Sequence, residues 1–184
     1  MKKFFSLVML LCVTLISAQE FSMDLVKNMK PRNIGPGGMS GRVTAIDVVT
    51  SNPDIMYVSG QGAQYAPSDE RGIYRTMDGG KNWKRVLFVN NTTGASSLSM
   101  NMNNPRILYA AMWQHQRYPW YMESGGENSG LYKSIDGGDT WTQMKTGLPK
   151  EFGKSGISVS RANSERVYAV IEAEGKKGGS LPFG

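Results

Sequence analysis

The sequence predicts an all-β protein made of repeated, four-stranded antiparallel units. A ten-residue stretch occurs twice, as YRTMDGGKNW at residues 74–83 and as YKSIDGGDTW at residues 132–141. Three further segments alternate apolar and polar residues on both sides of an asparagine-containing turn, as the strands of a hairpin do. They cover residues 43–60, 95–112 and 155–172. The chain has 22 glycines and no long segment with the 3.6-residue period of an amphipathic helix.

Residues 1–18 have the features of a secretory signal peptide. Lys2 and Lys3 precede an apolar run at residues 4–16, and small residues come before the cleavage site expected after Ala18. The apolar run is shorter than the ~20 residues that a membrane-spanning helix needs, so we expect no membrane span in the mature chain. The sequence therefore predicts a secreted or periplasmic protein.

Cleavage of the signal peptide also limits the chemistry of the mature chain. It removes Cys12, the only cysteine, and so excludes disulfides and thiolate chemistry. It lowers the net charge from +6 to about +4. The remaining lysines and arginines are scattered and form no basic stripe, so nucleic acid is not an expected partner. Residues 19–41 form a lead-in segment before the first repeat unit.

The repeat units follow one another along the rest of the chain. The first covers residues 42–94 and the second covers residues 95–154. In each, strands A and B flank an Asn-Pro turn, a longer loop leads from B to C, and Asp-Gly-Gly joins C to D. The third unit, residues 155–184, keeps Asn163 in its A–B turn but has Ser164 in place of the proline, and it stops before an Asp-Gly-Gly turn.

Four antiparallel strands in a repeat of this length are the pattern of a β-propeller blade. The chain then holds two blades and the first half of a third. Because propellers usually close with about 4–8 blades, the sequence predicts an incomplete propeller. Missing blades or self-association would be needed to close the ring.

The repeated turn has the chemistry of a structural hairpin. A short aspartate side chain accepts hydrogen bonds from backbone N–H groups of its own turn, and glycines adopt positive φ without steric cost. A calcium loop needs several closely spaced oxygen ligands, whereas the first turn offers only Asp78, so no metal is predicted. A phosphate-binding loop leads into a helix, which neither turn does, and no cofactor is predicted.

The pattern Ser/Thr-x-Asp-Gly-Gly-x-x-Trp resembles the Asp box, also called the BNR repeat. In sialidases, sortilin-type receptors and related bacterial propellers this box is a structural hairpin between strands C and D. The matching residues here are Thr76, Asp78, Gly80, Trp83, Ser134, Asp136, Gly138, Thr140 and Trp141. The resemblance implies that both aspartates and both tryptophans have structural roles.

Longer stretches resemble the sortilin-N-terminal-like propeller proteins of secreted bacterial origin, which are often labelled glycosyl hydrolases or exo-alpha-sialidase-like proteins. The stretches are RNIGPGGMSGRV, NTTGASSLSMNMNNPRILYAAMWQ, SGLYKSIDGGDTWTQMKTGLP and VYAVIEAE. The resemblance covers residues 30–175 and implies carbohydrate hydrolysis or ligand binding. We could not place the arginine triad, tyrosine nucleophile and carboxylates of sialidases on this chain, nor the carboxylates of xyloglucanase-like relatives.

Strand direction separates two ends of the predicted units. The A–B and C–D turns share one end, the turn end, where Asp78 and Asp136 are expected. The B–C and D–A loops share the opposite end, the loop end. These loops are residues 59–71, 89–95, 113–129 and 145–156. Loops on a rigid scaffold usually carry binding, so we look for function at the loop end.

Loop 113–129, WQHQRYPWYMESGGENS, is the richest in side chains suited to binding. The candidate ligand-binding residues are Arg117, Tyr118, Trp120 and Tyr121. Aromatic faces suit the C–H surfaces of sugars and the side chains of peptides. The alternative is that these rings cover the base of their own loop or pack against a neighbour. Trp113, which follows strand B directly, is predicted to pack.

Four carboxylates of the loop end are candidates for catalysis. They are Asp69, Glu70, Glu123 and Glu127. A glycosidase needs two carboxyl groups about 5–10 Å apart, a distance that a sequence does not contain. Charged loop carboxylates are usually solvated, so the catalytic residues stay unknown. His115, the only histidine, has no cysteine or histidine partner, and no zinc site is predicted.

These observations predict a secreted scaffold that binds glycan, peptide or protein through its loop end. They favour this binding role over an enzymatic one. The alternative is a remnant of a sialidase- or xyloglucanase-like glycoside hydrolase that acts on polysaccharide. A third interpretation is a truncated product without function. A binder requires Tyr118, Trp120 and Tyr121 to be exposed and co-planar, whereas a hydrolase requires two close carboxyl groups in a cleft.

Overall fold

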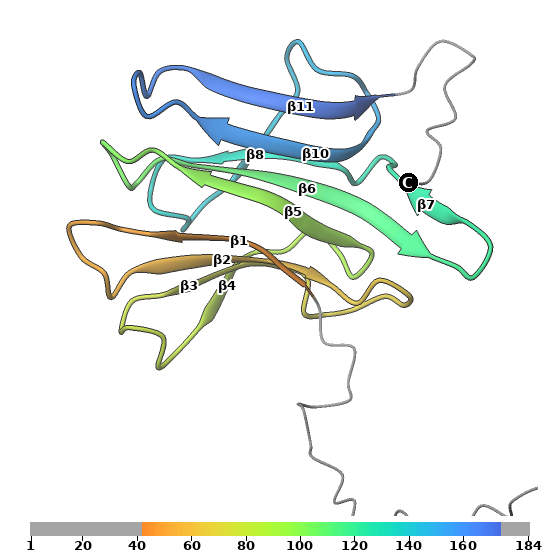
Figure 1. The fold of residues 1–184 in the computed structure, drawn as a ribbon, viewed down its shortest axis with the longest axis horizontal. Coiled ribbons are helices and arrows are strands. Elements are labelled where there is room, and N and C mark those ends of the chain that lie inside the picture. Colours follow the sequence, from red (N-terminus) through yellow and green to blue (C-terminus); the bar gives the residue numbers. More distant parts are fainter. Residues whose placement is uncertain (1–41, 174–184) are drawn as a thin grey trace, which may run out of the picture. The chain divides into compact units, whose positions relative to one another are not determined.

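The computed structural model describes residues 42–173. The predicted signal peptide, the lead-in segment 19–41 and residues 174–184 lie outside these residues. The described chain is all-β and forms three antiparallel sheets that pack face to face (Figure 1). Between Arg42 and Ala173 there is no helix with the length and hydropathy that a membrane crossing needs.

The predicted four-stranded antiparallel units are confirmed for the first two sheets. Sheet 1 has the order β1-β2-β3-β4, with bounds Arg42–Val48, Met56–Gly62, Gly72–Thr76 and Lys84–Leu87. Sheet 2 has the order β5-β6-β8-β9, with bounds Thr93–Met100, Leu108–Arg117, Gly130–Ser134 and Thr142–Met144, and β7 (Met122–Ser124) pairs with the far part of β6. Sheet 3 contains β10 (Phe152–Val159) and β11 (Val167–Ala173).

Strand β6 lies at the centre of the packing because both of its faces are buried. Leu108, Ala110 and Met112 belong to the apolar core between sheets 1 and 2. Tyr109 and Ala111 alternate with them and belong to the core between sheets 2 and 3. A strand covered on both faces has a continuous apolar run, which explains the sequence ILYAAMW at this point of the chain.

Short polar side chains connect the first strands of neighbouring sheets. Between β1 and β5, Thr44 Oγ1 donates to the Ala95 carbonyl oxygen (2.8 Å), and the Asp47 carboxylate accepts the Met100 N–H (2.8 Å). Between β5 and β10, Ser96 Oγ donates to the Ser155 carbonyl oxygen (2.6 Å). Threonine, aspartate and serine side chains therefore satisfy backbone groups between neighbouring sheets.

The A–B turns of all three sheets share one hydrogen-bond pattern. In the first two, the side-chain oxygens of Asn52 and Asn104 accept the N–H groups two positions later, those of Asp54 (3.3 Å) and Arg106 (3.2 Å). In the third, Asn163 Oδ1 accepts the Glu165 N–H (3.1 Å), and the Arg166 N–H donates to the Asn163 carbonyl oxygen (2.9 Å). The asparagine therefore keeps the turn intact although Ser164 replaces the proline.

The two Asp-Gly-Gly turns are built alike. In the second turn, Asp136 Oδ1 accepts hydrogen bonds from Ser134 Oγ (2.7 Å) and from the Thr140 N–H (3.0 Å). Trp141 Nε1 closes the turn by donating to the Gly138 carbonyl oxygen (3.1 Å). In the first turn the same bonds are made by Thr76, Asp78, Gly80, Asn82 and Trp83. These hydrogen bonds lower the pKa of the Asp136 and Asp78 carboxyls below their usual range.

Both glycines of each Asp-Gly-Gly turn have positive φ, as expected for this turn. The values are 70° and 91° for Gly79 and Gly80, and 79° and 89° for Gly137 and Gly138. The N–H of the first glycine donates to the neighbouring A–B turn, from Gly79 to the Asp54 carbonyl oxygen (3.1 Å) and from Gly137 to the Arg106 carbonyl oxygen (2.8 Å). The A–B and C–D turns therefore share the turn end.

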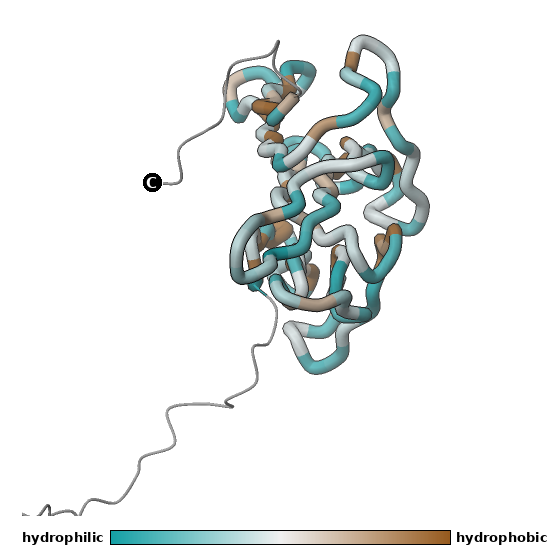
Figure 2. Tube along the Cα trace, turned by 90° about the vertical axis from the view of Figure 1, so that its right-hand side faces the viewer, coloured by the Kyte–Doolittle hydropathy of each residue, from teal (hydrophilic) through white to brown (hydrophobic). Residues whose placement is uncertain are grey.

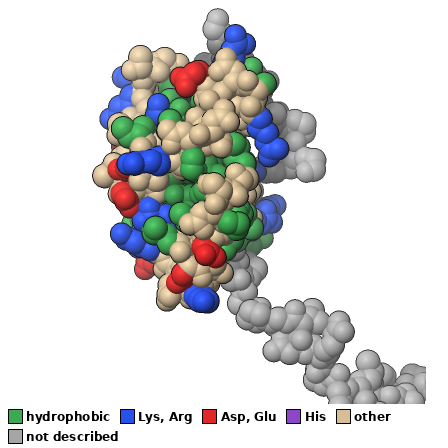
Figure 3. Space-filling view, turned by 90° about the vertical axis from the view of Figure 1, so that its left-hand side faces the viewer, with side chains coloured by type: hydrophobic (Ala, Val, Ile, Leu, Met, Phe, Trp, Pro, Cys, Tyr) green, Lys and Arg blue, Asp and Glu red, His purple; other side chains and the backbone are tan. Residues whose placement is uncertain are grey.

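Sheet 1 holds the second Asp-Gly-Gly turn by a polar contact at the turn end. The Gly137 carbonyl oxygen accepts hydrogen bonds from the Tyr57 hydroxyl (2.8 Å) and from Arg75 Nη1 (2.6 Å). Arg75 Nη2 also pairs with Asp139 Oδ1 at 2.9 Å. Figure 3 shows the turn end, where apolar side chains gather in the middle with charged residues around them.

Replacing Arg75 with methionine tests how far this contact stabilises the packing of sheets 1 and 2. The Arg75→Met variant loses two hydrogen bonds from a side chain that is only 12% exposed. We expect its free energy of unfolding to fall by about 1–3 kcal/mol, measured by urea denaturation. Lys84→Met on the neighbouring, exposed position of β4 is the control, and an equal loss in both variants would contradict this role of Arg75.

Candidate functional site

The loop end is more ordered than the sequence predicted, because part of loop 113–129 is a β-hairpin. Strand β6 continues to Arg117 and pairs with β7 in the register His115↔Ser124 and Arg117↔Met122. The Tyr118 N–H donates to the Tyr121 carbonyl oxygen (2.8 Å) and closes the hairpin tip. The prediction of an open loop from Trp113 onwards is therefore wrong. Burial alternates along W-Q-H-Q-R as in a strand, but Trp113 is the single apolar residue of the five, so hydrophobic alternation did not mark the longer strand.

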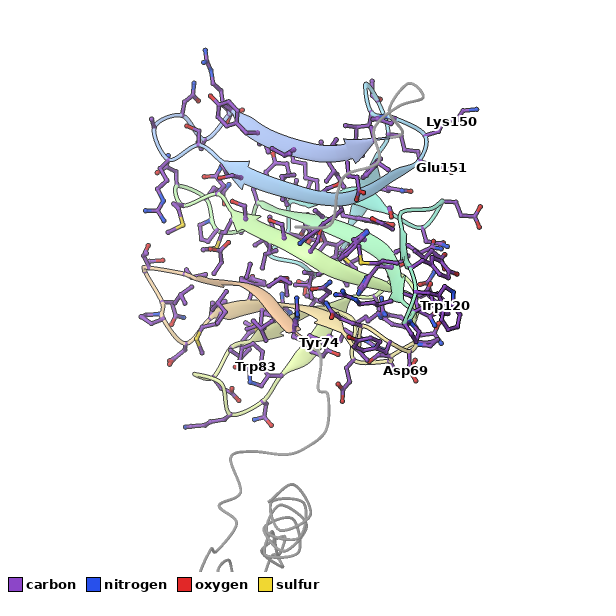
Figure 4. The ribbon with its side chains drawn as sticks, turned by 45° about the vertical axis from the view of Figure 1, so that its right-hand side comes forward. Asp69, Tyr74, Trp83, Trp120, Lys150 and Glu151 are labelled. Atoms are coloured by element: carbon purple, nitrogen blue, oxygen red, sulfur yellow. The ribbon has the colours of Figure 1, made fainter. Side chains whose placement is uncertain are left out.

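The hairpin tip carries the predicted aromatic residues. The Tyr118 ring stacks on the Tyr121 ring, with centroids 4.6 Å apart and an interplanar angle of 9°. It also stacks on the Trp120 ring at 6.4 Å and 29°. Tyr118 and Tyr121 are thus stacked face to face, whereas Trp120 lies farther from Tyr118 and is more inclined to it. The three rings do not lie in one plane and Tyr118 is half-buried, so the exposed, co-planar arrangement expected of a binder is not found. The Trp120 side chain is 79% exposed and that of Tyr121 is 49% exposed, so ring surface is open to solvent (Figure 4).

Arg117 is also exposed, and its backbone anchors the tip. The Arg117 N–H donates to the Gln64 carbonyl oxygen (2.7 Å), which joins the hairpin to the loop after β2. Trp113 is buried, as predicted, and Trp113 Nε1 donates to Ser124 Oγ (3.1 Å). Figure 2 views the molecule from the loop end, where hydrophilic and intermediate segments predominate over hydrophobic ones.

Beneath the hairpin lies a buried arginine that the sequence analysis did not single out. The Arg71 side chain is fully buried, and its guanidinium donates to carbonyl oxygens from three segments of the loop end. These acceptors are Ala63 (2.7 Å), Ala66 (3.3 Å), Thr92 (2.6 Å) and His115 (3.2 Å). Arg71 Nε has no partner among the described residues. The second unit has Ser129 at the matching position before its glycine, so no repeat pattern marked Arg71.

His115 packs against this arginine and is held in one orientation. Its ring stacks on Trp113 with centroids 4.2 Å apart. Nδ1 lies 3.2 Å from both the Trp113 carbonyl oxygen and Arg71 Nη1, and Nε2 lies 3.3 Å from Gln61 Nε2. Burial, reinforced by the positive charge of Arg71, lowers the pKa of His115 from 6.5 to about 4.

The four predicted carboxylates are all exposed on the loop end. They are Asp69, Glu70, Glu123 and Glu127. Glu123 Oε1 accepts a long hydrogen bond from Gln114 Nε2 (3.4 Å), and the Asp69 carbonyl oxygen accepts one from Arg85. None of the four lines the cleft at the loop end that contains Glu151 and Glu172. In the part of the chain that the structure describes, no group of three or more acidic, histidine or cysteine side chains could hold a metal ion.

A cleft of about 330 Å³ at the loop end is lined by two other glutamates, which the sequence analysis did not consider. They are Glu151 and Glu172, and Ser124, Gly125, Gly126 and Gly153 also line the cleft. Glu172 Oε2 accepts hydrogen bonds from Ser124 Oγ (2.7 Å) and from the Lys154 N–H (2.8 Å). A methyl group added at Gly153 would lie 2.3 Å from that oxygen, so the glycine makes room for the carboxylate.

Comparison with known proteins supports the fold. No protein-family model matches the sequence, and no curated protein sequence is significantly similar to it. The structure is similar to that of an ancestral GH74 enzyme, with a TM-score of 0.50 and 15% identity over 72% of this chain. It is also similar to the GH74 xyloglucanase from Xanthomonas campestris, with a TM-score of 0.50 and 16% identity over 71% of this chain. The matched parts are only 16% and 18% of those two chains.

The pKa of His115 leads to a pH dependence of stability. The unfolded chain takes up a proton near pH 6.5, whereas folded His115 stays neutral down to about pH 4. The unfolded state therefore binds more protons in this interval, and stability should fall as the pH drops from 6.5 to 4. Because His115 is the only histidine, urea unfolding of wild type and His115→Gln at pH 7.5, 6.5 and 5.5 isolates its contribution. Equal pH dependence in both proteins would contradict the lowered pKa.

Proposed function

We propose that this chain is part of a propeller-type scaffold that binds carbohydrate at its loop end. The observation that carries the proposal is the stacked aromatic tip of the β6–β7 hairpin, with Trp120 79% exposed. Trp120 presents an exposed apolar ring face, which suits the C–H surface of a sugar. Arg117 beside the tip adds hydrogen-bond donors for hydroxyl or carboxylate groups.

The support beneath the tip fits a binding role. Arg71 joins the loop after β2, the segment before β5, and β6 through carbonyl oxygens, so the hairpin is held before a ligand arrives. Preorganisation of this kind lowers the entropy that binding costs. The fold is that of glycoside hydrolase propellers, and the name of one similar structure makes xyloglucan the first polysaccharide to test.

We further infer that the two Asp-Gly-Gly turns are structural Asp boxes. Their shared hydrogen bonds and their place at the turn end, opposite the aromatic tip, support this assignment. We also propose that the protein acts outside the cytoplasm, because residues 1–18 have the pattern of a signal peptide and extracellular glycans would then be within reach.

The binding proposal is tested with Trp120→Ala. We expect the wild-type chain to bind xyloglucan oligosaccharides in isothermal titration calorimetry and the variant to bind about tenfold or more weakly, because truncating a central aromatic contact usually has an effect of this size. Tyr168→Ala on β11, where the tyrosine is 61% exposed, is the matched control for loss of a surface ring. A panel of other polysaccharides and of peptides accompanies xyloglucan. Equal affinity of wild type and Trp120→Ala for every ligand bound would contradict the proposal.

Glycoside hydrolysis is the second candidate function, and the specific observation in its favour is the pair Glu151 and Glu172 in one cleft. A pair of carboxyl groups flanking the bond is what most glycosidases need. The test is release of reducing sugar from xyloglucan and of nitrophenol from aryl glycosides, with Glu151→Gln and Glu172→Gln as variants. Activity that persists unchanged in both variants, or no activity in a wild-type protein shown to be folded, would reject this candidate.

A further inference from the structure

The contact between sheet 1 and the second Asp-Gly-Gly turn has three components. Tyr57 and Arg75 are cross-strand partners on β2 and β3, and both donate to the Gly137 carbonyl oxygen. Val86 on β4 is the third component, because it packs against Gly138. A methyl group added at Gly138 would lie 3.6 Å from the Val86 side chain and 3.4 Å from the Tyr57 side chain. Tyr57, Arg75 and Val86 together form a binding surface for the glycine turn, which we call the first receptor. Arg75 also supplies the cation that pairs with Asp139.

Sheet 2 repeats this receptor at the same positions of its strands. Tyr109 and Lys133 are cross-strand partners on β6 and β8, in the register of Tyr57 and Arg75. The Lys133 ammonium lies 5.4 Å from the centre of the Tyr109 ring, so the hydroxyl-bearing ring and the cation are adjacent here too. Met144 on β9 follows Trp141 as Val86 follows Trp83, and it supplies the apolar component.

Lys133 and Met144 of the second receptor border open space within the described chain, whereas Tyr109 is 8% exposed and packs in the core between sheets 2 and 3. A cleft of about 400 Å³ is lined by Lys133, Ile135, Met144 and Lys145, among others. Ile135 is 66% exposed and Met144 is 37% exposed, whereas the first receptor is filled by Gly137 and Gly138. Sheet 3 has two strands in residues 42–173 and covers β5 and β6 more than β8 and β9. No described residue accepts a hydrogen bond from the Lys133 ammonium.

We propose that Lys133 and Met144, next to the buried Tyr109, form a docking site for a β-hairpin with an Asp-Gly-Gly-Asp turn supplied by another polypeptide segment. The chemistry of the first receptor defines the ligand. Arg75 binds both a glycine carbonyl oxygen and the carboxylate two positions later, and Lys133 supplies the cation for the same two groups. The turn at residues 76–83 has Lys81 at that later position, which repels Lys133. A folded second copy therefore offers no suitable free turn, because its own Asp139 already pairs with Arg75.

The test uses a synthetic peptide with the sequence of residues 130–145, GLYKSIDGGDTWTQMK, cyclised through its ends because an isolated hairpin is marginally stable in water. Fluorescence anisotropy measures its binding to the full chain. We expect saturable binding by the wild type and about tenfold weaker binding by Lys133→Glu. A peptide with Asp139→Lys should bind the wild type weakly and should regain affinity for Lys133→Glu, since this charge reversal restores the pair.

Lys150→Glu at the loop end (Figure 4) is the matched control, because it makes the same charge change at a residue that does not line the cleft of the receptor. This variant should bind the unaltered peptide as the wild type does. Circular dichroism and the urea midpoint verify that Lys133→Glu is folded. Absence of binding by the wild type up to about 1 mM peptide, or no regain of affinity in the charge-reversed pair, would overturn the proposal.

Discussion

The carbonyl oxygen of Gly137 is the point on which the arrangement of the first two sheets depends. It is available because Asp136 satisfies the N–H groups of its turn and the two glycines adopt positive φ, which turns the carbonyl outwards. Tyr57 and Arg75 then bind it from the neighbouring sheet. The aspartate thus contributes to tertiary packing indirectly: it organises a turn, and the turn presents one acceptor to the next sheet. With the turns occupied in this way, the opposite ends of the strands are left to carry variable loops.

Much of this fold could be predicted from the sequence because its signals are local and repeated. Strand alternation, the Asn turns and the Asp-Gly-Gly turns each depend on residues within ten positions of one another, and each recurs. The β6–β7 hairpin was missed because its second strand has three residues and its turn, Tyr118 to Tyr121, lacks a glycine. Arg71 was missed for a different reason: its acceptors are carbonyl oxygens, and any residue type supplies a carbonyl.

The candidate site shows the same contrast between local features, which can be predicted from the sequence, and long-range contacts, which cannot. Aromatic residues gathered in one loop were visible in the sequence, and the structure brings three of them together at one tip. The carboxylates named from the sequence stay apart from the cleft, while Glu151 and Glu172 reach it from the loop before β10 and from β11. Which carboxyls converge is set by the pairing of strands far apart in the chain. The similarity to GH74 structures bears on the fold, and at 15–16% identity it does not transfer residue roles.

The alternation of β6 between two cores has a consequence for the order in which the molecule opens. Within residues 42–173, sheet 2 is covered on both faces, whereas sheets 1 and 3 are each packed against one neighbour. Local opening of either outer sheet leaves the other two in contact, but opening of sheet 2 removes both cores at once. Amide hydrogens of β5, β6 and β8 should therefore exchange with solvent most slowly, at rates that report global unfolding, while those of β4 and β11 exchange through smaller fluctuations. The protein behaves in this respect as a short array whose middle element sets its cooperativity.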